Sequence, residues 1–244
     1  MSQIDHPRHP LLRTWLFGPG ADSAAHDAMS ASGANVLILD LEDSTPPPLR
    51  DKARALAAGL FGRWRMAGAR VCVRINSLHE DGPLDLASVI PAKPDFIAYP
   101  KAATASDMRE LDRAITALEQ QSGLAPGSIG ILPVCETALG VVNLREIAAA
   151  SPRIRHALLG AEDLAADLMA ERSREAVELD YARRRFAHRQ DADAARRQAG
   201  LLFERGDGAI QFAHVTGRRR LRVGDEVGLG RDHRRKVQRP VLVQ

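Results

Sequence analysis

Carboxylate and basic side chains follow several short apolar runs of this sequence, and together they have the composition of a metal-assisted active site. The residues that stand after such runs are Asp40, Glu42, Asp43, Arg74, Lys101, Glu136, Glu162 and Asp163. Several carboxylates in one pocket raise one another's pKa values unless a cation lies among them. A hard divalent cation such as Mg²⁺ resolves that conflict and keeps positions open for a substrate. The pattern therefore predicts a Mg²⁺ site that a small molecule completes.

The two basic residues of this set have two interpretations each. The planar guanidinium of Arg74 can make two parallel charge-assisted bonds to a substrate carboxylate. It can also form a structural ion pair with Glu42 or Asp43. Lys101 can neutralise charge on a substrate or pair with a carboxylate of the same set. Charged residues are common where strands reach solvent. Five strand ends that carry this mixture nevertheless favour a site.

The elements that must position these residues are short apolar runs alternating with amphipathic segments. The runs are Thr14–Phe17, Val36–Leu39, Val71–Ile75, Phe96–Tyr99, Ile129–Val134 and Ala157–Leu159. Their length and their content of Val and Ile are typical of parallel strands buried on both faces. Six such repeats predict an α/β fold, either a barrel or a doubly wound sheet. In a parallel barrel all strand carboxyl ends open at one mouth, where the charged residues would converge.

Local signals mark where the intervening helices begin and end. Asp22 or Ser23 can cap a helix that ends at Gly33. Thr104 with Asp107 resembles a capping pair for a helix that starts after it. Neither a G-x-G-x-x-G motif nor a Walker loop follows any apolar run, which disfavours dinucleotide and P-loop sites.

Composition restricts the class of protein. The chain has 244 residues, of which 45% are hydrophobic and 27% charged, as in a soluble globular protein. No apolar run approaches the roughly 20 residues that span a bilayer, and the first residues have no signal-peptide core, so a cytoplasmic protein without membrane contact is expected. Cys72 and Cys135 form neither a disulfide framework nor a metal finger. Cys135 is expected to pack in the core.

The net charge of +3 is unevenly distributed. Residues 1–182 hold 18 Lys and Arg against 24 Asp and Glu, whereas residues 183–244 hold 16 against 7. The basic segment contains RRR at 183–185 and 218–220 and HRRK at 233–236. Nucleic-acid binding through this tail is one interpretation, but basic charge alone attracts nucleic acid without specificity, and stacking aromatics are scarce. A solvated or disordered tail is the favoured one.

Six motifs in order resemble one enzyme family. They are RTWLFGPG (13–20), LILDLED (37–43), VRIN (73–76), YPK (99–101), ETALGV (136–141) and GAEDLAADL (160–168). Their order and spacing resemble the HpcH/HpaI aldolase and citrate lyase β-subunit family over about residues 11–185. The resemblance implies a TIM (β/α)8-type barrel, usually homo-oligomeric, that uses Mg²⁺ to cleave or form a carbon–carbon bond next to a 2-oxo acid. Its substrates would be thioesters such as citryl- or malyl-coenzyme A.

The resemblance also implies roles for individual residues. Glu136 and Asp163 would be the metal ligands, and Arg74 would bind the substrate carboxylate. Backbone amides of Ala161, Glu162 and Asp163 would meet the oxo acid, with Lys101 as a further substrate contact. Asp40, Glu42 and Asp43 would hold metal-bound waters or order the site. Chelation of a 2-oxo acid by Mg²⁺ polarises its carbonyl group, which suits this chemistry.

The sequence departs from the family pattern after residue 185. Six β/α units can be assigned where a full barrel has eight, so we expect an incomplete barrel over residues 1–185. Residues 186–244 form an atypical basic tail, either frameshifted or disordered. A barrel that lacks two strands would expose two sheet edges. An inactive or truncated relative that only binds metal or oxo acid is therefore the alternative to an active lyase.

Overall fold

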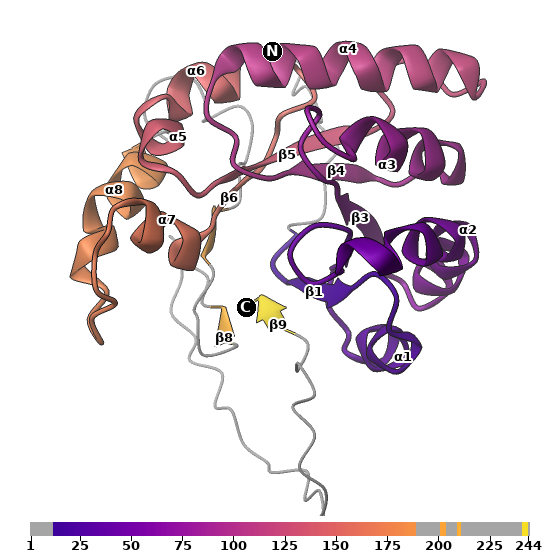
Figure 1. Cartoon of the computed structure of the whole chain (residues 1–244), viewed down its shortest axis with the longest axis horizontal. Coiled ribbons are helices and arrows are strands. Elements are labelled where there is room, and N and C mark those ends of the chain that lie inside the picture. Colours follow the sequence, from indigo (N-terminus) through magenta and orange to yellow (C-terminus); the bar gives the residue numbers. More distant parts are fainter. Residues whose placement is uncertain (1–11, 189–200, 204–208, 211–240, 244) are drawn as a thin grey trace, which may run out of the picture.

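The computed structural model describes residues 12–188, 201–203, 209–210 and 241–243, and its core is a sheet of six parallel strands that alternate with helices. The strands are β1 (Trp15–Pro19), β2 (Val36–Asp40), β3 (Arg70–Arg74), β4 (Phe96–Tyr99), β5 (Gly130–Cys135) and β6 (Ala157–Leu159). Each strand pairs in parallel with the next one along the chain. The helices form an arc around the outside of this sheet (Figure 1). The fold is thus a parallel half-barrel of the TIM type, as predicted.

The helices begin and end close to the signals in the sequence. They are α1 (Ser23–Ala31), α2 (Arg50–Met66), α3 (Gly82–Val89), α4 (Ala105–Gln121), α5 (Ala138–Val142), α6 (Leu144–Ala149), α7 (Ala161–Asp167) and α8 (Asp180–His188), with short 3₁₀ turns η1 (Pro47–Leu49), η2 (Ile90–Ala92) and η3 (Val177–Leu179). Asp22 caps α1, and Thr104 and Asp107 form a capping box on α4. α5 and α6 are separate because Asn143 interrupts them and donates from Nδ2 to the Ala103 carbonyl at 2.9 Å.

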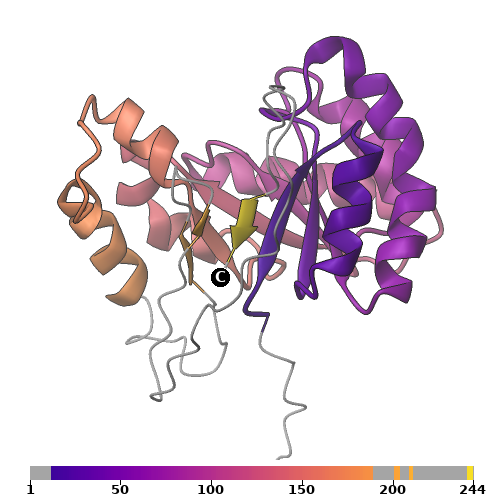
Figure 2. The ribbon, with the colours of Figure 1, turned by 90° about the horizontal axis from the view of Figure 1, so that it is seen from below.

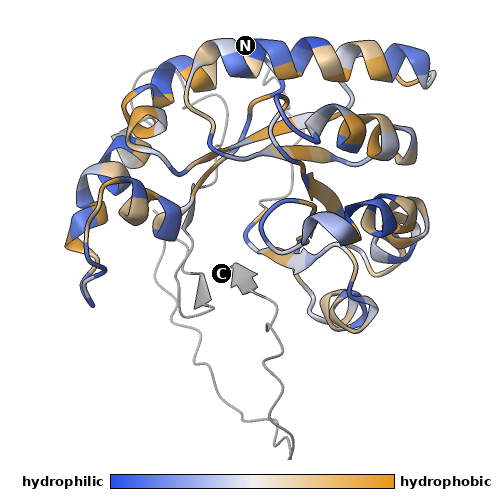
Figure 3. Ribbon diagram, viewed as in Figure 1, coloured by the Kyte–Doolittle hydropathy of each residue, from blue (hydrophilic) through white to orange (hydrophobic). Residues whose placement is uncertain are grey.

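The strands are buried on both faces. One hydrophobic cluster fills the space between the sheet and the helices and includes Leu37, Leu39, Phe61 and Trp64. A second cluster covers the inner face of the sheet: Trp15, Phe17, Val36, Ile38, Cys72, Ala98, Leu132, Val134 and Leu158. Hydrophobic residues accordingly colour the strands and the helix faces turned towards them (Figure 3). Cys135 is buried, as predicted.

Further strands pair with both edges of the parallel sheet. β7 (Leu201–Phe203) continues it in parallel beyond β6. β9 (Val241–Val243) pairs antiparallel with β1, and β8 (Ala209–Ile210) pairs with β9 (Figure 2). The expectation that both edges of the six-stranded sheet are exposed is therefore wrong, because backbone hydrogen bonds to β7 and β9 occupy them. No helix within the described ranges is long and apolar enough to cross a membrane.

Candidate active site

Charged side chains gather at the carboxyl end of the sheet. Asp40 and Arg74 are the last residues of β2 and β3 and lie opposite each other in the strand register. Lys101 follows β4, Glu136 follows β5, and Asp163 lies in the first turn of α7, directly after β6. Parallel strands present their carboxyl ends at one edge, so segments far apart in the sequence meet there.

A bidentate ion pair joins the ends of β2 and β3. Nε and Nη2 of Arg74 donate to Oδ1 and Oδ2 of Asp40, each at 2.7 Å, and both residues are buried. Burial acts to raise the pKa of Asp40, but the guanidinium outweighs it and holds that pKa below its usual range. Burial likewise acts to lower the pKa of Arg74, but the carboxylates around the guanidinium outweigh this effect and raise that pKa. Both groups therefore stay charged.

Arg74 also faces the rest of the acidic turn, which we define as residues 40–43. Its Nη1 lies 3.0 Å from Oε2 of Glu42 and 3.1 Å from Oδ2 of Asp43. The ring of Phe17 packs against the guanidinium, with its centroid 5.2 Å from Cζ. Arg74 thus makes structural ion pairs with Glu42 and Asp43, in line with one of the two interpretations of this residue. Its main partner is Asp40, which the sequence analysis did not pair with it.

Asp40 also organises the backbone around the acidic turn. Its carboxylate accepts hydrogen bonds from the N–H groups of Glu42 and Ser44, each at 3.0 Å, and from the Ser44 hydroxyl. Its carbonyl accepts from the Thr45 hydroxyl at 2.5 Å, and that hydroxyl oxygen accepts from the Gly20 N–H at 2.7 Å. A Cβ at position 20 would lie 2.9 Å from the Asp40 carbonyl oxygen. Glycine therefore lets the loop after β1 approach the acidic turn.

Lys101 contacts two carboxylates with two different donors. Its Nζ donates to Oε1 of Glu42 at 2.7 Å, and its backbone N–H donates to Oε1 of Glu136 at 2.8 Å. Burial acts to lower the pKa of Lys101, but the bond to Glu42 outweighs it and raises that pKa. The residue has a φ of 48°, a left-handed conformation that non-glycine residues adopt at a cost in free energy. Of the two interpretations of Lys101, the structure shows the one in which its ammonium group pairs with a carboxylate, that of Glu42.

Glu136 is a carboxylate in a confined position. It is 2% exposed, and burial raises its pKa to about 8, with further contributions from the charges of Asp163 and Glu42. A Cβ on Gly160 would lie 2.6 Å from Oε2 and 2.7 Å from Cβ of Glu136. The space that holds the Glu136 side chain thus exists because residue 160 has no side chain.

The segment after β6 brings a carboxylate and the amino end of a helix to the carboxyl end of the sheet. Gly160 is the N-cap of α7 and has no side chain to accept from the first N–H groups, which begin at Ala161. Asp163 lies in this first turn. The side chain of the adjacent Glu162 pairs with Arg172 at 3.0 Å instead. The carboxylate of Glu162 is therefore engaged by Arg172, and only the backbone of Glu162 is available to face a ligand at the carboxyl end of the sheet.

The pair of Glu136 and Asp163 suits a hard divalent cation. Their two carboxylates come from neighbouring strand ends, and the charge of Asp163 adds to the effect of burial in raising the pKa of Glu136, a repulsion that a cation would relieve. In the part of the chain that the structure describes, no three His, Cys, Asp or Glu side chains are grouped to hold a metal by themselves. A metal here would take its other ligands from water or a substrate.

Two residues to which the sequence analysis assigns no role are central to this geometry. Asn76 is fully buried and donates from Nδ2 to the carbonyl of Leu41, in the middle of the acidic turn, at 2.9 Å. Gly160 makes room for Glu136. The available signals were an amide residue just after an apolar run and a glycine just before an acidic pair, and both are weak by themselves.

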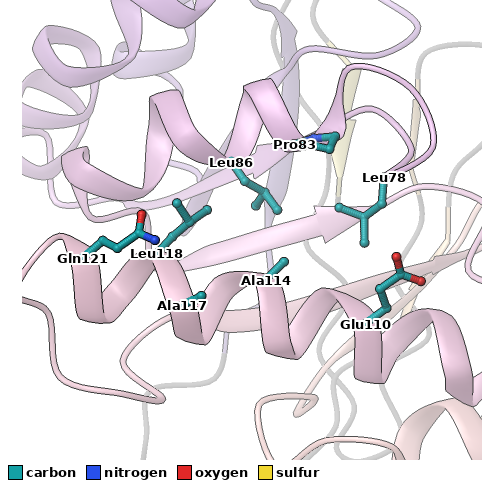
Figure 4. A pocket seen from close by; sticks show the side chains of 8 residues that line it. All are labelled: Leu78, Pro83, Leu86, Glu110, Ala114, Ala117, Leu118 and Gln121. Carbon is teal, nitrogen blue, oxygen red and sulfur yellow. The ribbon is translucent and has the colours of Figure 1, made fainter.

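A separate pocket lies between α3 and α4, in the helix layer (Figure 4). Its volume is about 320 Å³, and it is lined by Leu78, Pro83, Leu86, Glu110, Ala114, Ala117, Leu118 and Gln121. None of the charged residues at the strand ends lines it, so it is distinct from the candidate site.

The basic segments of the tail are only partly described. In the arginine run 183–185, Arg185 donates from Nη2 to the Val142 carbonyl at 2.6 Å, and Arg183 lies 3.6 Å from Asp180. Residues 209–210, further along the tail, form β8. The runs 218–220 and 233–236 lie outside the described residues, so the solvated tail that we favour, like the alternative of nucleic-acid binding, stays a prediction.

Comparisons of sequence connect this geometry to known proteins. The family model for HpcH/HpaI aldolase/citrate lyase matches residues 13–204. Citrate lyase subunit beta of Haemophilus influenzae is 36% identical over 174 residues, which cover 71% of this chain and 60% of that protein. The L-malyl-CoA/beta-methylmalyl-CoA lyase of Cereibacter sphaeroides is 37% identical over 163 residues, 64% of this chain and 50% of that protein. The chain thus spans 50–60% of the length of these two relatives.

Solved structures share the same architecture. Protein CitE of Mycobacterium tuberculosis, in complex with magnesium and acetate, is 30% identical with a TM-score of 0.57, covering 77% of this chain and 71% of that one. Haloferax volcanii malate synthase, in a pyruvate/acetyl-CoA ternary complex, has a TM-score of 0.69 over 83% of this chain and 61% of that one. At 17% identity, the malate synthase shows the fold alone.

Proposed function

Because the chain belongs to the HpcH/HpaI aldolase/citrate lyase family, we propose that it is a Mg²⁺-dependent carbon–carbon lyase. The reaction would cleave a 3-hydroxy-acyl thioester, such as citryl- or malyl-coenzyme A, into a 2-oxo acid and an acetyl thioester. The observation that carries the proposal is the position of Glu136 and Asp163 just after the carboxyl ends of the paired strands β5 and β6, where the Lys101 N–H also bonds to Glu136. The names of the citrate lyase and malyl-CoA lyase relatives support the substrate class.

Glu136 and Asp163 would hold the metal ion. When bound, Mg²⁺ supplies Lewis-acid polarisation of the oxygen on the carbon that becomes the 2-oxo group. The complex of the CitE protein with magnesium and acetate supports magnesium as the ion. Glu136 has to lose its proton to serve as a ligand. Asp40 fixes Arg74 and the acidic turn beside this pair, so the residues around the metal ligands are held in place before a substrate binds.

Arg74 would bind the carboxylate of the substrate. Asp40 occupies its Nε and Nη2, so the plane of the guanidinium is fixed by the chain itself. Its Nη1 edge faces Asp43, whose side chain is 55% exposed and can turn towards solvent. A substrate carboxylate would take the place of Asp43 at that edge and accept the same kind of charge-assisted bond from Nη1.

Lys101 and the start of α7 would bind the remaining polar atoms. Cleavage leaves an enolate on the thioester fragment, and a nearby cation stabilises that charge. The side chain of Lys101 is 55% exposed, and Lys101 lies with Glu136 at the carboxyl end of the sheet. The N–H groups at Ala161, Glu162 and Asp163 would donate to the oxo acid, because the N-cap residue Gly160 offers them no side-chain acceptor.

The purified full chain tests this proposal directly. With Mg²⁺ and citryl- or malyl-coenzyme A, we expect release of oxaloacetate or glyoxylate together with acetyl-coenzyme A, and its loss on addition of EDTA. A cooperatively folded protein that forms no product from either thioester would contradict the proposal. If oxaloacetate with Mg²⁺ then still raised the melting temperature, the chain would be the inactive, ligand-binding relative.

A further inference from the structure

A buried amide connects the end of β3 to the acidic turn. Asn76 lies two residues after Arg74 and is fully buried. Its Nδ2 donates to the Leu41 carbonyl at 2.9 Å, and the Leu41 N–H donates to the Arg74 carbonyl at 2.9 Å. Leu41 stands between Asp40 and Glu42, so both of its peptide groups are bonded to the segment that carries Arg74. The backbone of the acidic turn is thereby fixed relative to that segment.

Asn76 is itself anchored from the helix layer. Both its backbone N–H and its Nδ2 donate to Oδ2 of Asp85, each at 2.8 Å, and the Asp85 side chain is fully buried. The other oxygen, Oδ1, accepts from Nε of Arg54 at 2.8 Å. Arg54 reaches Asp51 and Asp81 as well, at 2.7 and 3.0 Å. A chain of charge-assisted hydrogen bonds therefore runs from α2 through α3 to the acidic turn.

We propose that Asn76 is a positioning residue, which holds the acidic turn, and with it the partners of Arg74, in the geometry needed for turnover. Without the Asn76 amide, the Leu41 carbonyl loses its side-chain donor and Asp85 loses one of its two bonds from Asn76. Asp40 and Glu42 flank Leu41, so a shift of its peptide moves both carboxylates against Arg74. Misplacement by about 1 Å can slow a reaction by about 100-fold.

If Asn76 had only a structural role, its replacement would be expected to affect stability alone. Removing a buried hydrogen bond lowers the free energy of unfolding wherever it lies in the protein. Asn35 offers a control at the opposite end of β2, at an exposed position where its Oδ1 accepts from the N–H groups of Arg13 and Thr14 at 2.8 and 3.1 Å. Asn35→Ala thus removes amide bonds to the backbone without contact with the acidic turn.

The test compares Asn76→Ala, Asp85→Asn and Asn35→Ala in the full chain. Asp85→Asn keeps the size of the side chain and weakens its bonds to Asn76 and to Arg54, so it serves if Asn76→Ala folds poorly. The first readout is amide hydrogen exchange of the segment 41–45, whose N–H groups bond to Arg74, Asp40 and Glu42. The second is kcat and KM with Mg²⁺ and the thioester substrate, which rests on the proposed function.

We expect faster exchange over 41–45 in both Asn76→Ala and Asp85→Asn, with kcat lowered about 10-fold to 100-fold and KM changed less. Asn35→Ala should leave both readouts as in the wild type, even where its melting temperature falls. Equal exchange in all three variants, or faster exchange with an unchanged kcat, would overturn the proposal. If the wild-type chain forms no product, the proposed lyase function fails, and the exchange readout still decides whether Asn76 fixes the turn.

Discussion

Gly160 and Glu136 occupy adjoining space so closely that a Cβ on residue 160 would lie 2.6 Å from Oε2 of Glu136. The Cβ of Glu136 would be 2.7 Å away, so rotation of the carboxylate alone cannot relieve the clash. A residue without any functional group thus determines where the carboxylate that we propose as a metal ligand lies.

Gly160→Ala should therefore lower the affinity for Mg²⁺ and slow turnover about 10-fold or more, because Glu136 has to move. The cost in stability should be about 1–3 kcal/mol. Calorimetric titration with Mg²⁺ and steady-state kinetics measure the two effects. Gly62→Ala, in α2 with nothing within 4 Å of the added Cβ, is the control and should leave metal affinity unchanged. Equal Mg²⁺ affinity in both variants would show that Glu136 does not hold the metal.

Glu136→Ala and Asp163→Ala should each abolish metal-dependent turnover while the fold persists. Each removes one of the two carboxylates proposed as ligands, and a site with a single protein carboxylate holds Mg²⁺ weakly. Mg²⁺ titration and far-UV circular dichroism measure binding and folding. Glu146→Ala, at an exposed position of α6, removes a carboxylate elsewhere and should behave as the wild type. Unchanged metal affinity in both ligand variants would remove the assignment.

The metal-free chain should lose stability as the pH rises from about 4.5 to about 8. Burial raises the pKa of Glu136 to about 8 from an ordinary value of 4.5, so between these values the folded state holds a proton that the unfolded state has lost. The loss should be on the order of 3 kcal/mol at pH 7. Urea unfolding in EDTA at several pH values measures it. Glu136→Gln should remove this part of the pH dependence, and an identical slope in both proteins would contradict the buried, protonated carboxyl.

Arg74→Lys should raise KM for the thioester about 10-fold and lower the free energy of unfolding by about 1–3 kcal/mol. Lysine keeps the charge but cannot reproduce the two parallel bonds to Asp40, so the carboxylate loses a donor. Kinetics and urea unfolding provide the measurements. Arg63→Lys, at the half-exposed pair with Asp27, should change stability by less than about 0.5 kcal/mol. Equal effects of the two substitutions would mean that the bidentate geometry is unimportant.

Lys101→Met should slow turnover about 10-fold or more, since it removes the cation proposed to face the enolate. The backbone N–H to Glu136 remains in this variant, so Mg²⁺ affinity should stay within about twofold of the wild type, because no proposed metal ligand is removed. Lys93 has the same left-handed conformation, with a φ of 59°, at the other end of the sheet. Lys93→Met is thus the matched control, and a kcat reduced equally in both variants would contradict a role for the Lys101 ammonium.

The fold was predictable because its signals are local. Buried parallel strands differ in composition from amphipathic helices, and caps such as Asp22 and Thr104 act through residues two or three positions away. The separation of α5 from α6 was not predictable, because Asn143 bonds to Ala103, 40 residues away. Pairing at the sheet edges likewise depends on segments distant in the chain.

For the site, the sequence predicted which residues converge but not how they pair. Charged residues after apolar runs must meet at one end of a parallel sheet, which places Asp40, Arg74, Lys101 and Glu136 together. The register between β2 and β3 sets Asp40 opposite Arg74, and no local pattern encodes that register. The roles of Asn76 and Gly160 in the site depend on packing alone, since an amide and a glycine carry no chemical signature of a site.

The inner face of the sheet limits which residues can stand beside Arg74. Ala98 lies beside Arg74 in the strand register and belongs to the inner apolar cluster, with only a methyl group for a side chain. Because Ala98 is fully buried, valine or leucine at this position would overpack the cluster and displace the guanidinium. A small side chain at position 98 is therefore a requirement for the undisturbed Asp40–Arg74 pair.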